Sequence, residues 1–220
     1  MKTITSEVTR SAPVFRAEPN WIEQLLHVFE NEDVVAVGGA PLADYETSRP
    51  GWLPRNFDWV FGCAYEGLPT RIAPLKHLIG SNMAVRRSAW SAVGGFVGSD
   101  FDDLNLCMRL ADRFGAQSVL YTPRSIVHHY VTAQRVSWNY FWRRCYFVNR
   151  EKVRVFRDMG EAANLVAERH FVLRAARSDV PRAVWRGLTG DRADLLAAGA
   201  MVTGIALAGL GNLSGRLARR

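Results

Sequence analysis

Acidic residues gather at one point of the sequence, in the stretch "SDFDDLNLCMRL" at residues 99–110. Asp100, Asp102 and Asp103 follow a pair of glycines and come just before residues with the spacing of an amphipathic helix. Acids in a first helical turn stabilise the free backbone N–H groups and the positive end of the helix dipole. A carboxylate at this place also suits general-base catalysis, because a neighbouring acid raises the pKa of one member of the pair. These residues alone leave both interpretations open.

Composition indicates a folded domain with room for an appendage. The chain has 220 residues, of which 48% are hydrophobic and 22% charged. Three widely spaced cysteines, Cys63, Cys107 and Cys145, predict free thiols in a reducing compartment rather than disulfides or a zinc site. The formal net charge is +7, and the stretch 135–186, with 12 basic and 5 acidic residues, carries all of it. Because this basic stretch precedes an apolar tail, it favours an anionic membrane surface as its partner.

The elements that must position these acids alternate between helix and strand. An amphipathic helix is expected in "PNWIEQLLHVFENE" at 19–32 and a short strand, ended by glycines, in "DVVAVGGAP". A strand and a short helix from about Arg87 follow, and two strand-like runs divided by Pro123 come after the acidic helix. This alternation indicates an α/β fold. The stretch 44–74, rich in proline and aromatic residues, is typical of a structured surface region used for binding.

The last third of the chain has a different character. From Arg135 onward, "WNYFWRRCYFVNREKVRVFRDMG" is both aromatic and basic, which is typical of a helix at a membrane interface. Residues 195–213 carry no charge, and their number is close to the roughly 20 residues that span a bilayer. Their alanine and glycine content leaves three alternatives open: a spanning helix, an interfacial helix or a buried one.

Four stretches together resemble a known family: "IGSNMAVRRSAW", "VGGF", "DFDDLNLCMRL" and "YTPRSIVHHYVTAQRVSWNYFWRRCY". They are similar to the second half of a family 2 inverting glycosyltransferase with the GT-A fold, over residues 21–152. Asp102 and Asp103 stand where the family has its acid pair, and Cys107 and Arg109 match the residues that follow it. The family pattern HxVxxxRxxxxYFxxRCY is matched from His129 to Tyr146. The resemblance implies a partial GT-A fold, a mixed sheet with flanking helices, followed by a helical C-terminal tail.

The resemblance also implies an organisation in three parts. Residues 1–18 are expected to be an irregular lead-in, residues 19–150 the acceptor-side part of a glycosyltransferase domain, and residues 151–220 a basic and apolar helical tail associated with a membrane. Family members begin with a nucleotide-binding half that ends in a DxD motif, and Trp21 matches the tryptophan that follows this motif. The chain is therefore expected to be a fragment or to work with a separate N-terminal half. Asp100-Phe101-Asp102 has the DxD spacing, but it opens a helix instead of closing a strand.

The resemblance assigns roles to particular residues. Asp102 or Asp103 would be the general base that removes the acceptor hydroxyl proton. His129 would be a metal ligand, although a structural role is the alternative and the adjacent His128 leaves open which ring faces inward. The cation, Mn²⁺ or Mg²⁺, would need the half that bears the DxD motif. The residues implied in binding the donor or substrate are Gly80, Asn82, Arg86, Arg87, Gly94, Gly95, Arg109 and Arg135.

The function that the resemblance implies is transfer of a sugar from a nucleotide sugar to a lipid-linked or envelope glycan acceptor, by inverting displacement. The site of action would be the cytoplasmic face of the plasma membrane, or the cytoplasm. The alternative is a catalytically inactive transferase half that binds the acceptor or the membrane. Nucleic-acid binding is not expected, because the sequence has no helix-turn-helix, zinc or RNP pattern.

Overall fold

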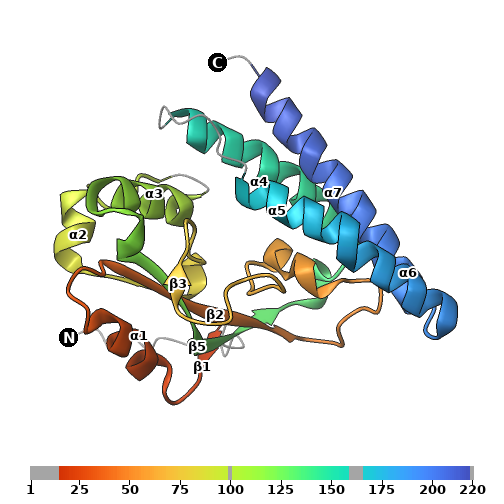
Figure 1. Cartoon of the computed structure of the whole chain (residues 1–220), viewed down its shortest axis with the longest axis horizontal. Helices are drawn as coiled ribbons and strands as arrows, with labels where there is room; N and C mark the ends of the chain where they lie inside the picture. The colour runs from red at the N-terminus through yellow and green to blue at the C-terminus, as the bar shows by residue number, and fades with distance from the viewer. Residues whose placement is uncertain (1–14, 99–100, 159–165, 219–220) are drawn as a thin grey trace, which may run out of the picture.

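The computed structural model describes residues 15–98, 101–158 and 166–218. The chain forms a mixed α/β fold in which helices cover both faces of a curled sheet, and a group of C-terminal helices extends from one end (Figure 1). The strands are β1 (Phe15–Ala17), β2 (Ala36–Tyr45), β3 (Ala73–Pro74), β4 (Met83–Val85) and β5 (Val119–Val131). The helices are α1 (Trp21–Phe29), α2 (Arg87–Ala92), α3 (Asp102–Phe114), α4 (Trp138–Asp158), α5 (Val166–Arg174), α6 (Val180–Thr189) and α7 (Ala193–Leu217). Short helical turns are η1 (Arg55–Phe61), η2 (Gly80–Asn82), η3 (Ala116–Ser118), η4 (Ala133–Arg135) and η5 (Ala175–Asp179).

The sheet is built around the long parallel pair β2 and β5. Its order is β1-β5-β2-β4, with β1 and β3 antiparallel to β5 and β4 antiparallel to β2. Gly38 lies opposite Tyr121 but Ala40 lies opposite Ile126, so β5 bulges around Pro123. A proline has no N–H to donate to the ladder, and a bulge accommodates it. The two runs predicted on either side of Pro123 are therefore one strand with a bulge.

The glycines of β2 do not end the strand, contrary to the sequence expectation. The strand continues to Tyr45 because Gly39 leaves space for the residues that pack against it. A Cβ atom at Gly39 would lie 2.3 Å from both Asn82 Nδ2 and the Ser125 carbonyl oxygen. Asn82 donates to this Ser125 carbonyl at 2.9 Å and accepts from the Trp21 indole N–H at 2.7 Å. These bonds tie α1, β5 and η2 together across the strand.

Two apolar clusters hold helices on the faces of the sheet. On one face, Leu25 and Val28 of α1 pack against Val34 and Val37. On the other face, the buried side of α3 packs against β2 and β5, through a cluster that includes Leu106, Cys107, Leu110, Ala36 and Val119. The predicted helices at 19–32, from Arg87 and after the acidic residues are confirmed as α1, α2 and α3. The α/β class predicted from the sequence is confirmed as well.

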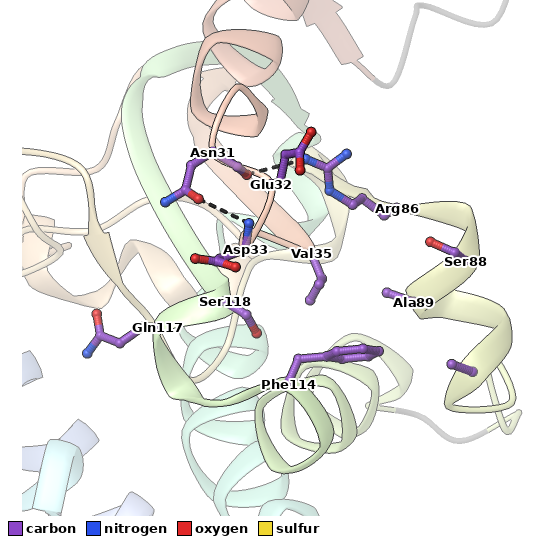
Figure 2. A pocket seen from close by; sticks show the side chains of 11 residues that line it. Asn31, Glu32, Asp33, Val35, Arg86, Ser88, Ala89, Phe114, Gln117 and Ser118 are labelled. Carbon is purple, nitrogen blue, oxygen red and sulfur yellow. Dashed lines mark hydrogen bonds between the residues drawn. The ribbon is translucent and has the colours of Figure 1, made fainter.

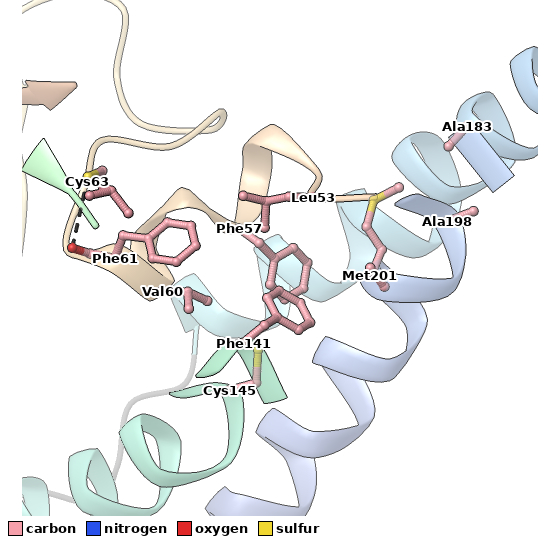
Figure 3. Packing of buried hydrophobic residues seen from close by; sticks show 12 residues of the cluster. Leu53, Phe57, Val60, Phe61, Cys63, Phe141, Cys145, Ala183, Ala198 and Met201 are labelled. Carbon is pink, nitrogen blue, oxygen red and sulfur yellow. Dashed lines mark hydrogen bonds between the residues drawn. The ribbon is translucent and has the colours of Figure 1, made fainter. Parts of the chain in front are cut away.

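A third cluster joins the C-terminal helices to the rest of the chain. Phe57 and Phe61 of η1 pack with Phe141 of α4 and Met201 of α7 in a fully apolar core (Figure 3). The expected domain boundary at residue 150 falls within α4, so the helical tail begins without a break from the preceding segment. The buried thiols of Cys63 and Cys145 belong to this cluster. The cysteines are unpaired, as predicted, and burial raises the pKa of each of the three thiols to about 12.

Helix α7 lies along α4 and contacts it through glycines. A Cβ atom at Gly211 would lie 2.1 Å from the Tyr146 carbonyl oxygen, and one at Gly215 would lie 2.6 Å from that of Arg150. The opposite side of α7 leaves leucines such as Leu196 and Leu217 exposed. In the described part of the chain, α7 is the one helix long and apolar enough to cross a membrane, and 28% of its apolar window is buried. A helix packed along one side and apolar on the other is compatible with the spanning and interfacial alternatives.

Candidate active site

Asp103 lies in the first turn of α3 with its carboxylate held on several sides. Its Oδ2 atom accepts the Gly80 N–H at 3.0 Å, and its Oδ1 atom accepts the Leu104 N–H at 2.8 Å. The Nε2 atom of His77 lies 3.3 Å from Oδ2, and the Asp103 side chain remains 28% exposed. A carboxylate has about four lone-pair positions, so a solvent-accessible oxygen can still accept a proton from a bound hydroxyl. This carboxylate is fixed in direction and open to a substrate.

The surroundings of Asp103 favour its charged form. Burial by itself would raise the pKa of this carboxyl group, because it removes water from the charge. The contact with His77 and the hydrogen bonds from the Gly80 and Leu104 N–H groups have the opposite effect. Together they outweigh the effect of burial, so the pKa of Asp103 lies below its ordinary value. Since that ordinary value is about 3.9, Asp103 is ionised at neutral pH, as a general base must be.

Asp102 has a different environment from its neighbour. Its two carboxylate oxygens accept the N–H groups of Val97 and Gly98 at 3.2 and 3.1 Å, which fastens the loop in front of α3. Phe101, and neither acid of the pair, is the N-cap residue of α3. Asp100 lies outside the described residues, so the DxD-like spacing noted above is not described. Both acids therefore accept backbone N–H groups and are half-buried, and Asp103 differs in its contacts with Gly80 and His77.

Arg109 and the two glycines belong to the same braced loop. The Arg109 guanidinium donates to the carbonyl oxygens of Val93 and Gly95, and its Nε–H donates to Asn105 Oδ1 at 2.6 Å. Gly94 and Gly95 both have positive φ, at +81° and +67°. A Cβ atom at Gly95 would also lie 2.4 Å from the Trp90 ring, so only glycine fits this turn. These contacts give Arg109, Gly94 and Gly95 a structural task at the start of α3.

The site continues from Gly80 toward β5 and η4. The Ser81 hydroxyl donates to the Gly62 carbonyl oxygen at 3.5 Å, and a Cβ atom at Gly62 would lie 3.7 Å from Cε1 of His129. Arg135 NH1 lies 3.3 Å from His129 Nε2, while its other nitrogens donate to the Phe61 carbonyl at 2.9 Å and to the Tyr140 hydroxyl at 3.1 Å. A chain of contacts thus runs from Asp103 through Gly80, Ser81 and Gly62 to His129 and Arg135.

The two adjacent histidines face different partners. His128 Nε2 lies 2.5 Å from Glu18 Oε1, whereas His129 is buried beside Arg135. Burial and then the Arg135 charge lower the pKa of His129, which favours the neutral ring. Within residues 15–98, 101–158 and 166–218, no group of three His, Cys, Asp or Glu side chains could hold a metal ion. The described residues do not by themselves provide the site for the cation that the resemblance implies.

Three other predicted binding residues have partners other than Asp103 or begin a helix. Asn82 bonds to Trp21 and Ser125, as described above. The Arg86 guanidinium donates to the carbonyl oxygens of Phe29 and Val34, both at 2.7 Å, beside a hollow of about 710 Å³ (Figure 2). The exposed Arg87 begins α2. Phe114, at the last turn of α3, lines this hollow, so the hollow is separated from Asp103 by most of a helix that rises about 1.5 Å per residue.

Sequence reasoning missed His77. A single histidine in the loop "PLKHLIG" belongs to no motif, and nothing in its spacing relates it to Asp103, 26 positions later. Its role becomes visible only because β4 and η2 bring this loop against the start of α3. Hydrogen-bond partners that come from distant loops leave no periodic signal in a sequence.

Sequence comparison shows that the chain is similar to a glycosyltransferase. This relative is the glucosyl-dolichyl phosphate glucuronosyltransferase of Haloferax volcanii. The two are 30% identical over 142 residues, which cover 58% of this chain and 45% of the relative. The chain thus matches less than half the length of this curated relative. No family model matches the chain. The mixed sheet with its covering helices is compatible with a glycosyltransferase fold.

Proposed function

We propose that this chain is the acceptor-side part of an inverting glycosyltransferase of the GT-A type, with Asp103 as its general base. The observation that carries the proposal is the Asp103 carboxylate, which is ionised, partly exposed and oriented by Gly80, Leu104 and His77. The similarity to a glucuronosyltransferase supports the reaction class. Of the acid pair, we assign Asp103 as the base because its Oδ2 atom also contacts His77, whereas the Asp102 oxygens accept the N–H groups of the loop in front of α3.

In the proposed reaction, an acceptor hydroxyl oxygen attacks the anomeric carbon of a nucleotide sugar. The new bond forms on the face opposite the departing nucleoside diphosphate, whose bond to the anomeric carbon breaks, so the configuration inverts. The hydroxyl proton moves to the Asp103 carboxylate as the attack proceeds. Positioned proton transfer of this kind contributes about 10²- to 10⁴-fold to the rate. Arg135, next to His129 and the 61–62 turn, adds fixed positive charge beside the path of an anionic substrate.

The acceptor that we propose is a polyprenyl phosphate that carries a sugar. The name of the Haloferax volcanii relative describes action on a glucosyl-dolichyl phosphate, which is such a lipid. The exposed apolar side of α7 supports work at a membrane surface, and the net positive charge of residues 135–186 supports an anionic one. Of the two predicted locations, these features favour the membrane over the cytoplasm, and the cytoplasmic face stays a prediction.

The proposed function is tested by measuring sugar transfer with a panel of nucleotide sugars. Each donor is offered with a sugar-bearing prenyl phosphate and, separately, with the same sugar lacking the lipid. The assay uses the full chain, alone and with a nucleotide-binding half of a related transferase. We expect transfer from one donor, with strong preference for the lipid-linked acceptor. Absence of transfer in every combination would support the alternative of an inactive acceptor-binding module.

Replacement of His77 tests how the base is tuned. In the variant His77→Gln, the pKa of Asp103 is expected to rise, because the His77 contact that favours the carboxylate is lost. A base with a higher pKa is protonated at higher pH, so the acid limb of the kcat/KM profile should move upward in pH. His128→Gln is the matched control, since His128 contacts Glu18 instead. An unchanged acid limb in His77→Gln would show that His77 does not position or tune the base.

A further inference from the structure

A second hollow, of about 480 Å³, lies between the first half of α7 and two tryptophans. Its walls carry no charged side chain; they include Trp52, Trp138, Leu195, Leu196, Gly199 and Thr203. The rings of Trp52 and Trp138 meet edge to face at 5.3 Å, and each lies within 5.5 Å of the Phe141 ring. We call this apolar surface the tryptophan groove. Through Phe141, its two tryptophans pack against the aromatic core shown in Figure 3.

The tryptophan groove opens onto the exposed apolar side of α7. Leu196 is 64% exposed and Trp138 46% exposed at its margin. An apolar hollow that continues into exposed leucines and tryptophan suits an apolar ligand that enters from a lipid phase, since burial of such a ligand removes apolar area from water. A charged or strongly polar ligand would find few partners there, because burying unpaired polar groups costs free energy.

The groove also begins close to the candidate active site. Trp138 follows Arg135 by three residues, which span at most roughly 10 Å. Arg135 in turn contacts His129 and the Phe61 carbonyl, beside the turn that Ser81 joins to Gly80 and Asp103. The Arg135 guanidinium therefore lies close enough to the groove to meet an anionic head group on a ligand whose apolar tail fills it.

Gly199 keeps the groove open. A Cβ atom at this position meets no heavy atom within 4 Å, although the residue lines the groove. A glycine inside a helix costs about 0.5–1 kcal/mol relative to alanine. Gly209 of the same helix also has free space around its Cβ position, but it does not line the groove. The two positions form a matched pair, because the Cβ position is open at both and only Gly199 lines the groove.

We propose that the tryptophan groove holds the prenyl chain of the lipid-linked acceptor, with the phosphate of the lipid toward Arg135. This inference rests on the proposed function for the identity of the lipid. It adds a binding site for the methyl-branched, apolar part of that substrate, which aromatic rings and leucines contact without any polar partner.

The test uses geranylgeranyl monophosphate with a photoreactive group at the end of its chain. After irradiation with the full chain, mass spectrometry locates the labelled residues. We expect label on Trp52, Trp138 and residues 195–203, and loss of at least about tenfold in labelling, equivalent to about 1.4 kcal/mol, in Gly199→Phe. Gly209→Phe should label like the wild type. Unlabelled geranylgeranyl monophosphate should compete, whereas inorganic phosphate and a straight-chain alkyl phosphate of equal length should compete weakly.

Three results would overturn the proposal: label placed elsewhere, equal labelling of Gly199→Phe and Gly209→Phe, or equal competition by the straight-chain alkyl phosphate. Circular dichroism and thermal melting of both phenylalanine variants establish that they are folded. The labelling needs no sugar transfer, so it separates the two proposals. A chain that labels in the groove but transfers sugar neither alone nor with a nucleotide-binding half contradicts the proposed function. A chain that transfers sugar while labelling elsewhere contradicts the groove.

Discussion

Turnover is expected to fall by about a hundredfold or more when Asp103 is replaced by Asn, because a positioned general base contributes about that much to the rate. The amide keeps one oxygen that can accept the Leu104 N–H, so the helix start is retained. The Gly80 N–H loses a charged acceptor, which is expected to cost about 1–2 kcal/mol of unfolding free energy. Initial rates at saturating substrate, together with the melting temperature, separate the loss of chemistry from the loss of stability.

Asp102→Asn is the matched control for this substitution. Asp102 lies one position earlier in the same helical turn, but its oxygens accept the N–H groups of Val97 and Gly98. We expect its loss to lower the melting temperature while turnover stays within a few-fold of the wild type. Near-normal turnover of both asparagine variants would show that the acids only stabilise the start of α3. A large loss in Asp102→Asn alone would transfer the catalytic assignment to Asp102.

Gly211→Ala is expected to destabilise the chain by about 1–3 kcal/mol, the usual cost of overpacking a close contact. The added methyl group would lie 2.1 Å from the Tyr146 carbonyl oxygen and 3.3 Å from the Arg150 amide nitrogen, so α7 must move away from α4. Both contacts are backbone atoms of a helix and cannot rotate aside. Thermal unfolding and amide hydrogen exchange in α4 and α7 measure the effect.

Gly209→Ala should act in the opposite direction. Its Cβ position is open, and alanine is favoured over glycine inside a helix by about 0.5–1 kcal/mol. The pair therefore compares the same chemical change two residues apart in one helix. If Gly211→Ala were as stable as Gly209→Ala, α7 would not pack against α4 in the way described.

Local patterns predicted the elements well where a single period dominates. The apolar spacing of Leu25 and Val28 predicted α1, and the acidic start with a regular apolar face predicted α3. The limits of β2 and β5 could not be predicted, because glycine and proline usually end strands. Here Gly39 is required by the close approach of Asn82 and Ser125, and Pro123 lies in a bulge. Both features depend on strand partners that a linear pattern does not contain.

The site was predictable to the extent that it rests on a motif. The acid pair stood out in the sequence itself, and its catalytic role and Arg135 came from the resemblance. In the structure, a chain of contacts links Asp103 to Arg135. The sequence could not separate Asp102 from Asp103, because the difference lies in which loop each carboxylate meets. The sequence also could not show that Arg86, expected to bind the donor or substrate, has a different task. In the structure, its guanidinium donates to backbone carbonyl oxygens of the 29–34 segment.

The anomeric configuration of the first product tests the central claim most directly. Proton NMR of the transferred sugar, recorded early in turnover, reports whether the configuration of the donor has inverted. The proposed mechanism, in which Asp103 takes the proton of an attacking acceptor hydroxyl, predicts a product of inverted configuration whose formation is lost in Asp103→Asn. A product that retains the donor configuration would contradict the single displacement and the role of Asp103 as its base.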